Sequence, residues 1–211
     1  MKKIKPSQDT EFVRPERYKE ASKAISYDKH IHAANAGRRA SHWLEIRALK
    51  RALSRIEGKK ALDGPCGTGR INEILSANFK TVVSLDSSEA MLSVHQRNAG
   101  SGMLCCGDIF NLPFRDDYFD WTVSYRLFHH MQNRWDRISF LESIARVAGQ
   151  GIIFTAWINT PISRRRGSRR CALDRKETES LILEAKLRLV NIDYVSWPFQ
   201  PKCVITCRKP I

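Results

Sequence analysis

The chain has 211 residues, of which 42% are apolar and 27% charged, and its formal net charge is +14. This composition is typical of one ordinary globular domain and excludes a disordered chain. No apolar run reaches the roughly 20 residues of a membrane-spanning helix, and residues 1–20 lack the apolar stretch of a secretory signal. We therefore expect a cytoplasmic protein. Its positive charge favours anionic partners such as nucleic acid, anionic lipid or a phosphorylated substrate.

The six cysteines are expected to be ordinary reduced thiols. Their scatter does not suggest a disulfide framework in a chain of this size. Cys203 and Cys207 lie close together, but a zinc site needs further ligands at suitable spacing. No metal site is therefore predicted.

Residues 1–40 are expected to form a basic lead-in or cap before a single domain over residues 41–211. Residues 1–30 are rich in Lys, Arg and Glu, which indicates a loosely packed segment. From Ser41 to Gly58, apolar residues recur at three- and four-residue steps. That pattern predicts an amphipathic helix, and Gly58 is a fair stop signal for it.

Short apolar segments then alternate with helical patterns. The predicted strands cover Lys60–Asp63, Thr81–Asp86, Gly102–Gly107, Phe119–Tyr125, Gly151–Trp157, Val190–Trp197 and Cys203–Arg208. The predicted helices cover 70–77, 88–97, 134–148 and 178–189. This alternation implies an α/β, Rossmann-like, doubly wound fold with a seven-stranded, mainly parallel sheet. The last two strands are joined by a link short enough only for a hairpin, so the last strand should be antiparallel.

The strongest local signal is a turn that follows the first predicted strand, Asp63-Gly64-Pro65-Cys66-Gly67-Thr68-Gly69. An acid ends the strand, and a Gly-rich turn then opens a helix; glycines let the backbone approach a ligand closely. A dinucleotide-binding G-x-G-x-x-G fingerprint would need glycine where Asn72 stands. The pattern is instead D-x-x-x-G-x-G.

Two further acids follow the next two strands. Asp86 has the spacing from Asp63 at which a carboxylate accepts hydrogen bonds from both hydroxyls of a ribose. Its alternative role is a helix cap, because Ser87, Ser88 and Glu89 come next. Asp108 follows the third strand, and its alternative role is to cap a turn.

Residues 112–120 read Leu-Pro-Phe-Arg-Asp-Asp-Tyr-Phe-Asp and lead into the fourth strand. With the turn and the three acids, this stretch resembles class I methyltransferases that depend on S-adenosylmethionine (SAM), of the methyltransferase type 11-like, small-molecule branch. The resemblance covers about residues 45–157 and implies SAM as the methyl donor. In that family the acid at Asp108 faces the adenine amino group, and its neighbour packs on the ring. The implied cofactor-binding residues are Asp63, Gly64, Cys66, Gly67, Gly69, Asp86, Asp108, Ile109 and Tyr125.

The end of the fourth strand bears on the acceptor. Family members that methylate exocyclic base amines have an N/D-P-P-Y/F/W motif there, whereas this chain has Ser124-Tyr125-Arg126-Leu127, which disfavours that chemistry. Arg126, His129 and His130 are the candidate catalytic residues, because open α/β sheets bind ligands at this edge. Either histidine is a candidate base for a hydroxyl nucleophile, and the alternative is a structural His pair.

Five arginines fall within the seven residues from 164 to 170. A loop that leaves the carboxyl end of a parallel strand overhangs the ligand crevice. Guanidinium groups suit phosphates and carboxylates, so Arg164, Arg165 and Arg166 are predicted to bind an anionic substrate. The alternatives are a solvated basic loop and a nucleic-acid patch.

These features predict a SAM-dependent methyltransferase that acts on a small or lipid-linked, anionic acceptor such as a glycolipid, with O-methylation favoured. The expected location is the cytoplasm or the inner membrane surface. The alternatives are an RNA methyltransferase and a nucleic-acid-binding protein with a silent methyltransferase fold. The acceptor atom and the oligomeric state stay open.

Overall fold

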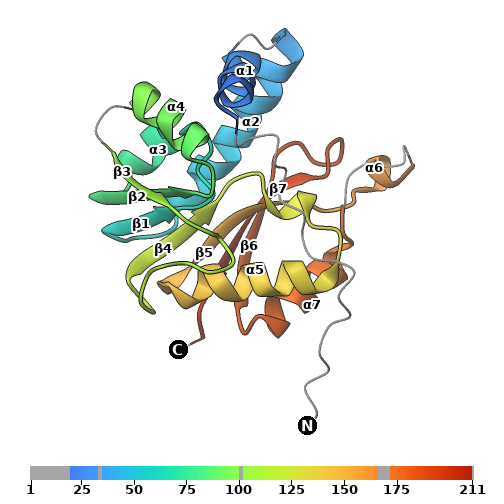
Figure 1. The fold of residues 1–211 in the computed structure, drawn as a ribbon. Helices are drawn as coiled ribbons and strands as arrows, with labels where there is room; N and C mark the ends of the chain where they lie inside the picture. The colour runs from blue at the N-terminus through green and yellow to red at the C-terminus, as the bar shows by residue number, and fades with distance from the viewer. Residues whose placement is uncertain (1–19, 33–34, 100–101, 166–171, 211) are drawn as a thin grey trace.

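A computed structural model describes residues 20–32, 35–99, 102–165 and 172–210. Its centre is a seven-stranded sheet with the order β3-β2-β1-β4-β5-β7-β6 (Figure 1). The strands are β1 (Lys60–Asp63), β2 (Thr81–Asp86), β3 (Met103–Cys106), β4 (Phe119–Ser124), β5 (Ala148–Trp157), β6 (Arg188–Tyr194) and β7 (Lys202–Arg208). Strand β7 pairs antiparallel with β5 and β6, whereas β1 to β5 pair in parallel. The predicted fold and the antiparallel last strand are confirmed.

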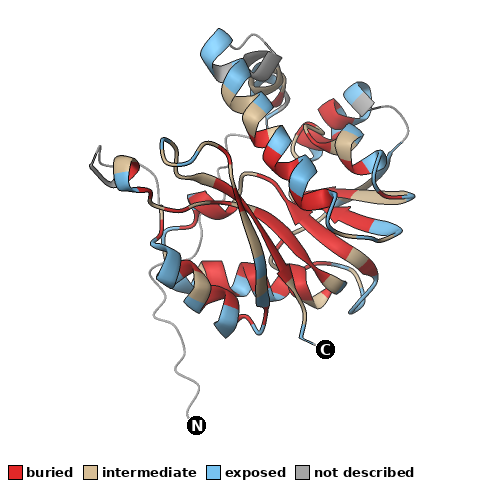
Figure 2. Cartoon of the chain, turned by 180° about the vertical axis from the view of Figure 1, so that it is seen from behind, coloured by how far each residue is buried: buried red, intermediate tan, exposed pale blue. Residues whose placement is uncertain are grey.

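Helices cover both faces of the sheet, as a doubly wound fold requires. The helices are α1 (Ala21–His32), α2 (Ala36–Leu53), α3 (Asn72–Ser76), α4 (Glu89–Ala99), α5 (Arg134–Arg146), α6 (Pro161–Arg165) and α7 (Arg175–Glu184), with a 3₁₀ turn η2 at Phe128–His130. Successive residues of β5 point to opposite faces: Ile152 and Phe154 pack with α5 and α7, and Ile153 packs with α2 and α3. Both faces of this strand are buried (Figure 2).

The helix expected over Ser41–Gly58 is the element whose bounds differ most. Helix α2 begins earlier, at Ala36, and ends at Leu53. Gly58 is therefore not its stop signal. A Cβ at Gly58 would lie 2.9 Å from the Asp120 Cβ and 3.0 Å from the Trp121 ring, so the glycine permits the chain to pass close to β4.

Helix α7 also differs from the range 178–189, because it begins at Arg175 and ends at Glu184. Its end is made by Lys186, which has a positive φ of 57°. The N–H of Leu187 donates to the Ile182 carbonyl, and the N–H of Lys186 donates to the Leu183 carbonyl. These bonds resemble the glycine-based ending of many helices, but here a lysine takes the left-handed conformation.

The N-terminal segment contains structure that the sequence patterns did not predict. Helix α1 packs against α4 through Ala24, Met91 and Val94. Helix α2 crosses the expected domain boundary at residues 40–41 and packs on β6 and β7. Within the described ranges, no helix has the length and apolar character needed to cross a membrane.

Candidate cofactor and acceptor site

A cavity of about 230 Å³ opens at the carboxyl ends of β1, β2 and β4, the edge where open α/β sheets bind ligands. Most of the residues predicted to bind the cofactor line it, together with residues that the sequence argument did not select. The predicted residues in its wall are Asp63, Cys66, Gly67, Asp86, Asp108, Ile109, Tyr125, Arg126 and His130. The further residues include Tyr27, Arg70, Met91 and Leu127.

The Gly-rich turn after β1 depends on two glycines with positive φ, Gly67 at 55° and Gly69 at 85°. A Cβ at Gly69 would lie 2.5 Å from the His95 ring, so only glycine fits there. Gly64 meets a similar limit, since a Cβ would lie 2.9 Å from the Ile109 side chain. Gly64 and Gly69 do not line the cavity themselves; their lack of a side chain permits the packing behind its wall.

Asp63 is fully buried at the end of β1, and its carboxylate faces the cavity. Neither of its two oxygens has a hydrogen-bond partner among the described residues. Burial, and secondarily the negative charge of Asp86, raises the pKa of Asp63 to about 8. An unpartnered buried carboxylate is costly unless a ligand compensates it. A ligand with a cationic group or a hydrogen-bond donor near Asp63 would therefore lower the cost of ionising this side chain.

Asp86 accepts backbone hydrogen bonds from both the Gly-rich turn and the loop after β2. One carboxylate oxygen accepts the Gly67 N–H at 2.9 Å, and the other accepts the Ser88 N–H at 2.9 Å. Burial raises the pKa of Asp86, and these backbone N–H groups lower it in part. The cap of α4 itself is Ser88, whose Oγ accepts the Met91 N–H at 3.2 Å. Asp86 thus ties the turn to the loop after β2 while it also lines the cavity.

Asp108 lies in a tight turn after β3. One of its carboxylate oxygens accepts the Phe110 N–H at 3.0 Å, as the capping alternative predicts. Asp108 and Ile109 both remain in the cavity wall, and Ile109 is buried. The structure therefore has an acid and an apolar side chain next to each other at this end of the cavity.

Arg70 is a cation in the cavity wall that the glycine pattern did not single out. Its Nε is buried without a hydrogen-bond partner in the described part of the chain. The guanidinium lies 5.7 Å from the centroid of the Tyr125 ring. The cavity thus contains an uncompensated carboxylate, Asp63, and a guanidinium with a free donor.

A buried acid from α2, Glu45, organises the residues at the end of β4. Its carboxylate accepts the Tyr125 hydroxyl at 2.7 Å and the Lys202 ammonium at 2.5 Å. The Arg126 guanidinium lies 3.9 Å from it. These contacts join residues far apart in the chain, so sequence spacing gave no sign of them. They place two cations, Arg126 and Lys202, against a single carboxylate beside the cavity.

The three candidate catalytic residues differ in their access to the cavity. Arg126 lines it and has a positive φ of 68°, a conformation in which its N–H donates to the Thr155 hydroxyl at 2.5 Å. His130 also lines the cavity and is exposed. His129 is buried and stacks on the Trp157 ring at a centroid distance of 5.3 Å, outside the cavity wall. Of the two histidines, only His130 is positioned to meet a ligand there.

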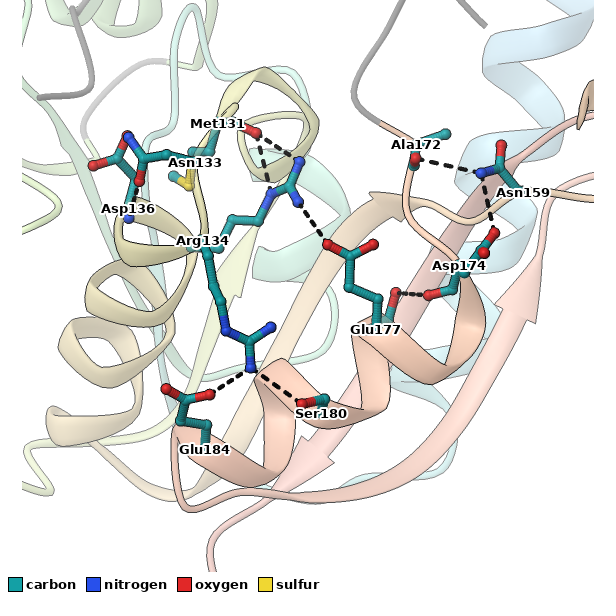
Figure 3. Close-up of polar contacts among 12 residues, drawn as sticks. Met131, Asn133, Arg134, Asp136, Asn159, Ala172, Asp174, Glu177, Ser180 and Glu184 are labelled. Atoms are coloured by element: carbon teal, nitrogen blue, oxygen red, sulfur yellow. Dashed lines mark hydrogen bonds and ion pairs between the residues drawn. The ribbon is translucent and has the colours of Figure 1, made fainter. Parts of the chain in front are cut away.

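The arginine-rich loop is anchored at both ends beside the end of β5. The Asn159 N–H donates to the Leu173 carbonyl at 2.8 Å, and the Asn159 side chain contacts Ala172 and Asp174 (Figure 3). Thr160 and Ser163 exchange reciprocal hydrogen bonds that cap α6. Arg164 and Arg165 end this helix, and their side chains are not described; Arg166 lies outside the described residues.

The helices beneath that loop are held together by polar contacts. Arg134 of α5 donates to Ser180 and pairs with Glu184 of α7 (Figure 3). The buried Arg137 donates twice to the Met131 carbonyl and lies 3.7 Å from Glu177. These contacts fix α7 against α5, so the ends of the loop have a rigid support.

Comparison with known proteins agrees with this arrangement. Residues 62–155 match the family model described as a methyltransferase domain. A magnesium protoporphyrin IX methyltransferase of Synechocystis with bound SAM has the same fold, with a TM-score of 0.74 over 97% of this chain and 100% of that one, at 14% identity. The fold and the acids at its strand ends define a class I methyltransferase domain. Residues 62–155 are therefore a methyltransferase domain with the class I fold, and SAM is the cofactor of the proteins of this class.

The curated relatives differ in acceptor. The chain is 36% identical over 107 residues to a demethylmenaquinone methyltransferase of Corynebacterium kroppenstedtii. The aligned region covers 50% of this chain and 44% of that protein. It is 26% identical over 121 residues to a tRNA (carboxymethyluridine(34)-5-O)-methyltransferase of Arabidopsis thaliana. The aligned region covers 56% of this chain and 28% of that protein. The chain spans 65% of the length of one curated relative and 20% of another.

Proposed function

We propose that this protein transfers the methyl group of SAM to a small or lipid-linked anionic acceptor, with an oxygen atom as the favoured nucleophile. The observation that carries the proposal is that Asp63 and Arg70, each with buried polar atoms that lack a partner among the described residues, line the same cavity. The methionine part of SAM has an ammonium, a carboxylate and a sulfonium. A buried carboxylate without a partner complements the positive groups, and a guanidinium with a free donor complements the negative one.

The other walls of the cavity suit the nucleoside part. Asp86 retains lone pairs after it accepts two backbone N–H groups, and in our proposal these accept the ribose hydroxyls. Asp108 and Ile109 would take the adenine, with the acid toward its amino group and the apolar side chain against the ring. The glycines of the turn let the backbone pass close to the ligand, because no side chain intervenes.

Bound SAM would supply a methyl group on a sulfonium; as the O–CH3 bond forms, the S–CH3 bond breaks and its electrons stay on the sulfur of the neutral thioether S-adenosylhomocysteine. The residues of this chain then need to align the acceptor, exclude water and remove a proton from its hydroxyl. Arg126 and His130 lie in the cavity wall at the end of β4. In the proposal Arg126 binds an anionic group of the acceptor, and His130 accepts the hydroxyl proton. The arginine-rich loop at the end of β5 adds further positive charge at the same edge.

An RNA acceptor is the second candidate. It is favoured by the relative named as a tRNA methyltransferase and by the net charge of +14. The missing N/D-P-P-Y/F/W motif after β4 disfavours methylation of base amines, but it leaves methylation of an oxygen open. Both candidates share the same cofactor site and differ only in what reaches it.

Labelling of fractionated cell extract with methyl-labelled SAM separates the candidates. Purified protein is incubated with the lipid, small-molecule and RNA pools, and Asp86→Ala serves as the binding-deficient control. Label in the lipid or small-molecule pool supports the proposal. Label in the RNA pool alone supports the second candidate, and no transfer to any pool by protein that binds SAM contradicts both.

A further inference from the structure

The hairpin between β6 and β7 ends in an exposed, uncharged tip, which we define as residues 196–201. Trp197 is 53% exposed and Phe199 is 63% exposed. Ser, Gln and two prolines complete the tip, so it contains no charged side chain. Trp197 packs on the Tyr194 ring at a centroid distance of 4.8 Å, so the tip presents an exposed aromatic surface.

Part of the backbone of the hairpin tip is hydrogen-bonded internally. The N–H groups of Phe199 and Gln200 both donate to the Ser196 carbonyl at 2.9 Å. Pro198 and Pro201 have no N–H, and the Pro201 carbonyl accepts the Ile158 N–H at 2.7 Å. These bonds satisfy two of the four backbone N–H groups of the tip, which lowers the cost of moving it into a less polar medium.

Helix α2, which contacts the hairpin, has an exposed basic face. Arg39, Trp43, Arg47 and Lys50 are exposed and follow one another at helical spacing on a single face. Arg47 lies over the Trp43 ring at 4.7 Å. Helix α2 contacts the hairpin directly, since Arg51 donates to the Tyr194 carbonyl at 3.0 Å and Lys202 donates to Ser41 at 2.8 Å. Figure 1 shows the hairpin leaving the sheet beside this helix.

The hairpin tip also lies at the functional edge of the sheet. It joins the end of β6 to the start of β7, and β7 runs antiparallel to β5. The tip therefore projects from the same edge as the loops that form the cavity. Lys202, the first residue after the tip, is hydrogen-bonded to Glu45, which also holds Tyr125 of the cavity wall.

We propose that the hairpin tip inserts into the interface of an anionic membrane while the basic face of α2 contacts the lipid headgroups. Aromatic side chains favour that interface, and nearby lysines and arginines are attracted to anionic lipid. The net charge of +14 gives the complementary long-range attraction. Docking in this way brings the cavity edge to the bilayer, where a lipid-linked acceptor resides.

The distribution of charge favours a bilayer over single-stranded RNA as the partner. Proteins that bind single strands interleave aromatic side chains with cations along a groove. Here no cation lies between the two aromatics of the tip, because residues 196–201 contain none, and the cations around Trp43 lie on a separate element, α2. An uncharged aromatic tip with cations on a neighbouring helix suits a membrane surface, where the interface favours aromatic rings and the headgroups attract cations.

Vesicle co-sedimentation tests the inference without an acceptor, so its outcome does not depend on the proposed methyl transfer. The probes are phosphatidylcholine vesicles with and without anionic phosphatidylglycerol. The test variant is Trp197→Ser with Phe199→Ser. The matched control is Trp135→Ser, because Trp135 is 58% exposed on α5, which packs on the face of the sheet opposite α2. Trp197→Phe keeps an aromatic ring at the tip.

The expected result is binding of the wild type to anionic vesicles, lowered about ten-fold or more by the double variant, since two interfacial aromatics are lost. Trp135→Ser and Trp197→Phe should bind as the wild type does. A circular dichroism spectrum equal to that of the wild type shows that the double variant is folded. The inference is overturned if the wild type does not sediment with anionic vesicles, or if the folded double variant binds them as well as the wild type. Loss of single-stranded RNA binding in the double variant, with vesicle binding unchanged, also overturns it.

Discussion

Replacing Asp63 with Asn removes a carboxyl group whose pKa is raised to about 8 by burial and by Asp86. At pH 7 about nine-tenths of ligand-free chains therefore carry a proton on Asp63, as follows from a pKa one unit above the pH. A cationic ligand favours the ionised carboxylate and returns its pKa toward the ordinary value. Binding of SAM should therefore release about 0.9 proton per chain at pH 7, and its affinity should rise about ten-fold per pH unit between pH 5 and pH 8.

Isothermal titration in two buffers with different ionisation enthalpies measures this proton release. Asp63→Asn should abolish the release and flatten the pH dependence of SAM affinity. At pH 8 its affinity should fall roughly 10–150-fold, because a hydrogen bond to a charged group contributes about 1.5–3 kcal/mol. Asp116→Asn is the matched control, since Asp116 is an exposed partner of Arg146. Release of no protons by the wild type between pH 6 and pH 7 would refute this account of Asp63.

The same group sets a pH dependence of folding in the absence of ligand. Because the folded-state pKa of Asp63 is raised above its unfolded value, its contribution to stability is full below about pH 4 and is lost as the pH rises through about 8. From pH 5 to pH 8 the wild type should therefore lose this part of its free energy of unfolding, whereas Asp63→Asn should not, so the variant becomes more stable relative to the wild type. Urea denaturation at the two pH values measures the difference. A constant difference between the proteins would contradict the raised pKa.

Three further variants test Asp86, His130 and the arginine-rich loop. Asp86→Ala should weaken SAM binding roughly 10–150-fold and also lower the melting temperature, because two backbone N–H groups lose their acceptor; unchanged affinity in titration calorimetry would limit Asp86 to a capping role. His130→Gln should lower kcat and remove the acidic limb of its pH profile while SAM affinity stays constant, and a wild-type profile would exclude His130 as the base. Replacing Arg164, Arg165 and Arg166 with Ser should raise the acceptor KM and flatten the salt dependence of kcat/KM without changing SAM affinity; a shallower salt slope of RNA binding would instead assign the loop to RNA.

The fold was largely predictable because hydrophobic periodicity and turn residues are local signals. Strands β1 and β2 have the expected bounds, since each is a short apolar run that ends in an acid. The prediction that α2 ends at Gly58 was wrong. That glycine is required because the chain packs closely against β4 there, and β4 lies far along the sequence. The end of α7 was missed because a lysine, rather than a glycine, takes the left-handed conformation.

The candidate site was predictable in its cofactor half and less so in its acceptor half. Asp63 and Asp86 belong to a short motif with fixed spacing, so sequence alone placed them together. Glu45 and Lys202 contact each other across 157 positions of the chain, and no local pattern marks such a pair. Arg70 follows the turn directly, but only the structure shows that its Nε is buried without a partner.

Titration of the folded protein with SAM and with its demethylated product, S-adenosylhomocysteine, tests the central claim most directly. The account predicts one site per chain and a melting temperature that rises with ligand concentration. The free energy of unfolding should increase by about 2.7 kcal/mol when the ligand concentration is one hundred times the dissociation constant. Asp63→Asn and Asp86→Ala should both reduce this shift. Absence of any thermal shift at millimolar SAM, in protein shown to be folded, would contradict the assignment of the cavity to this cofactor.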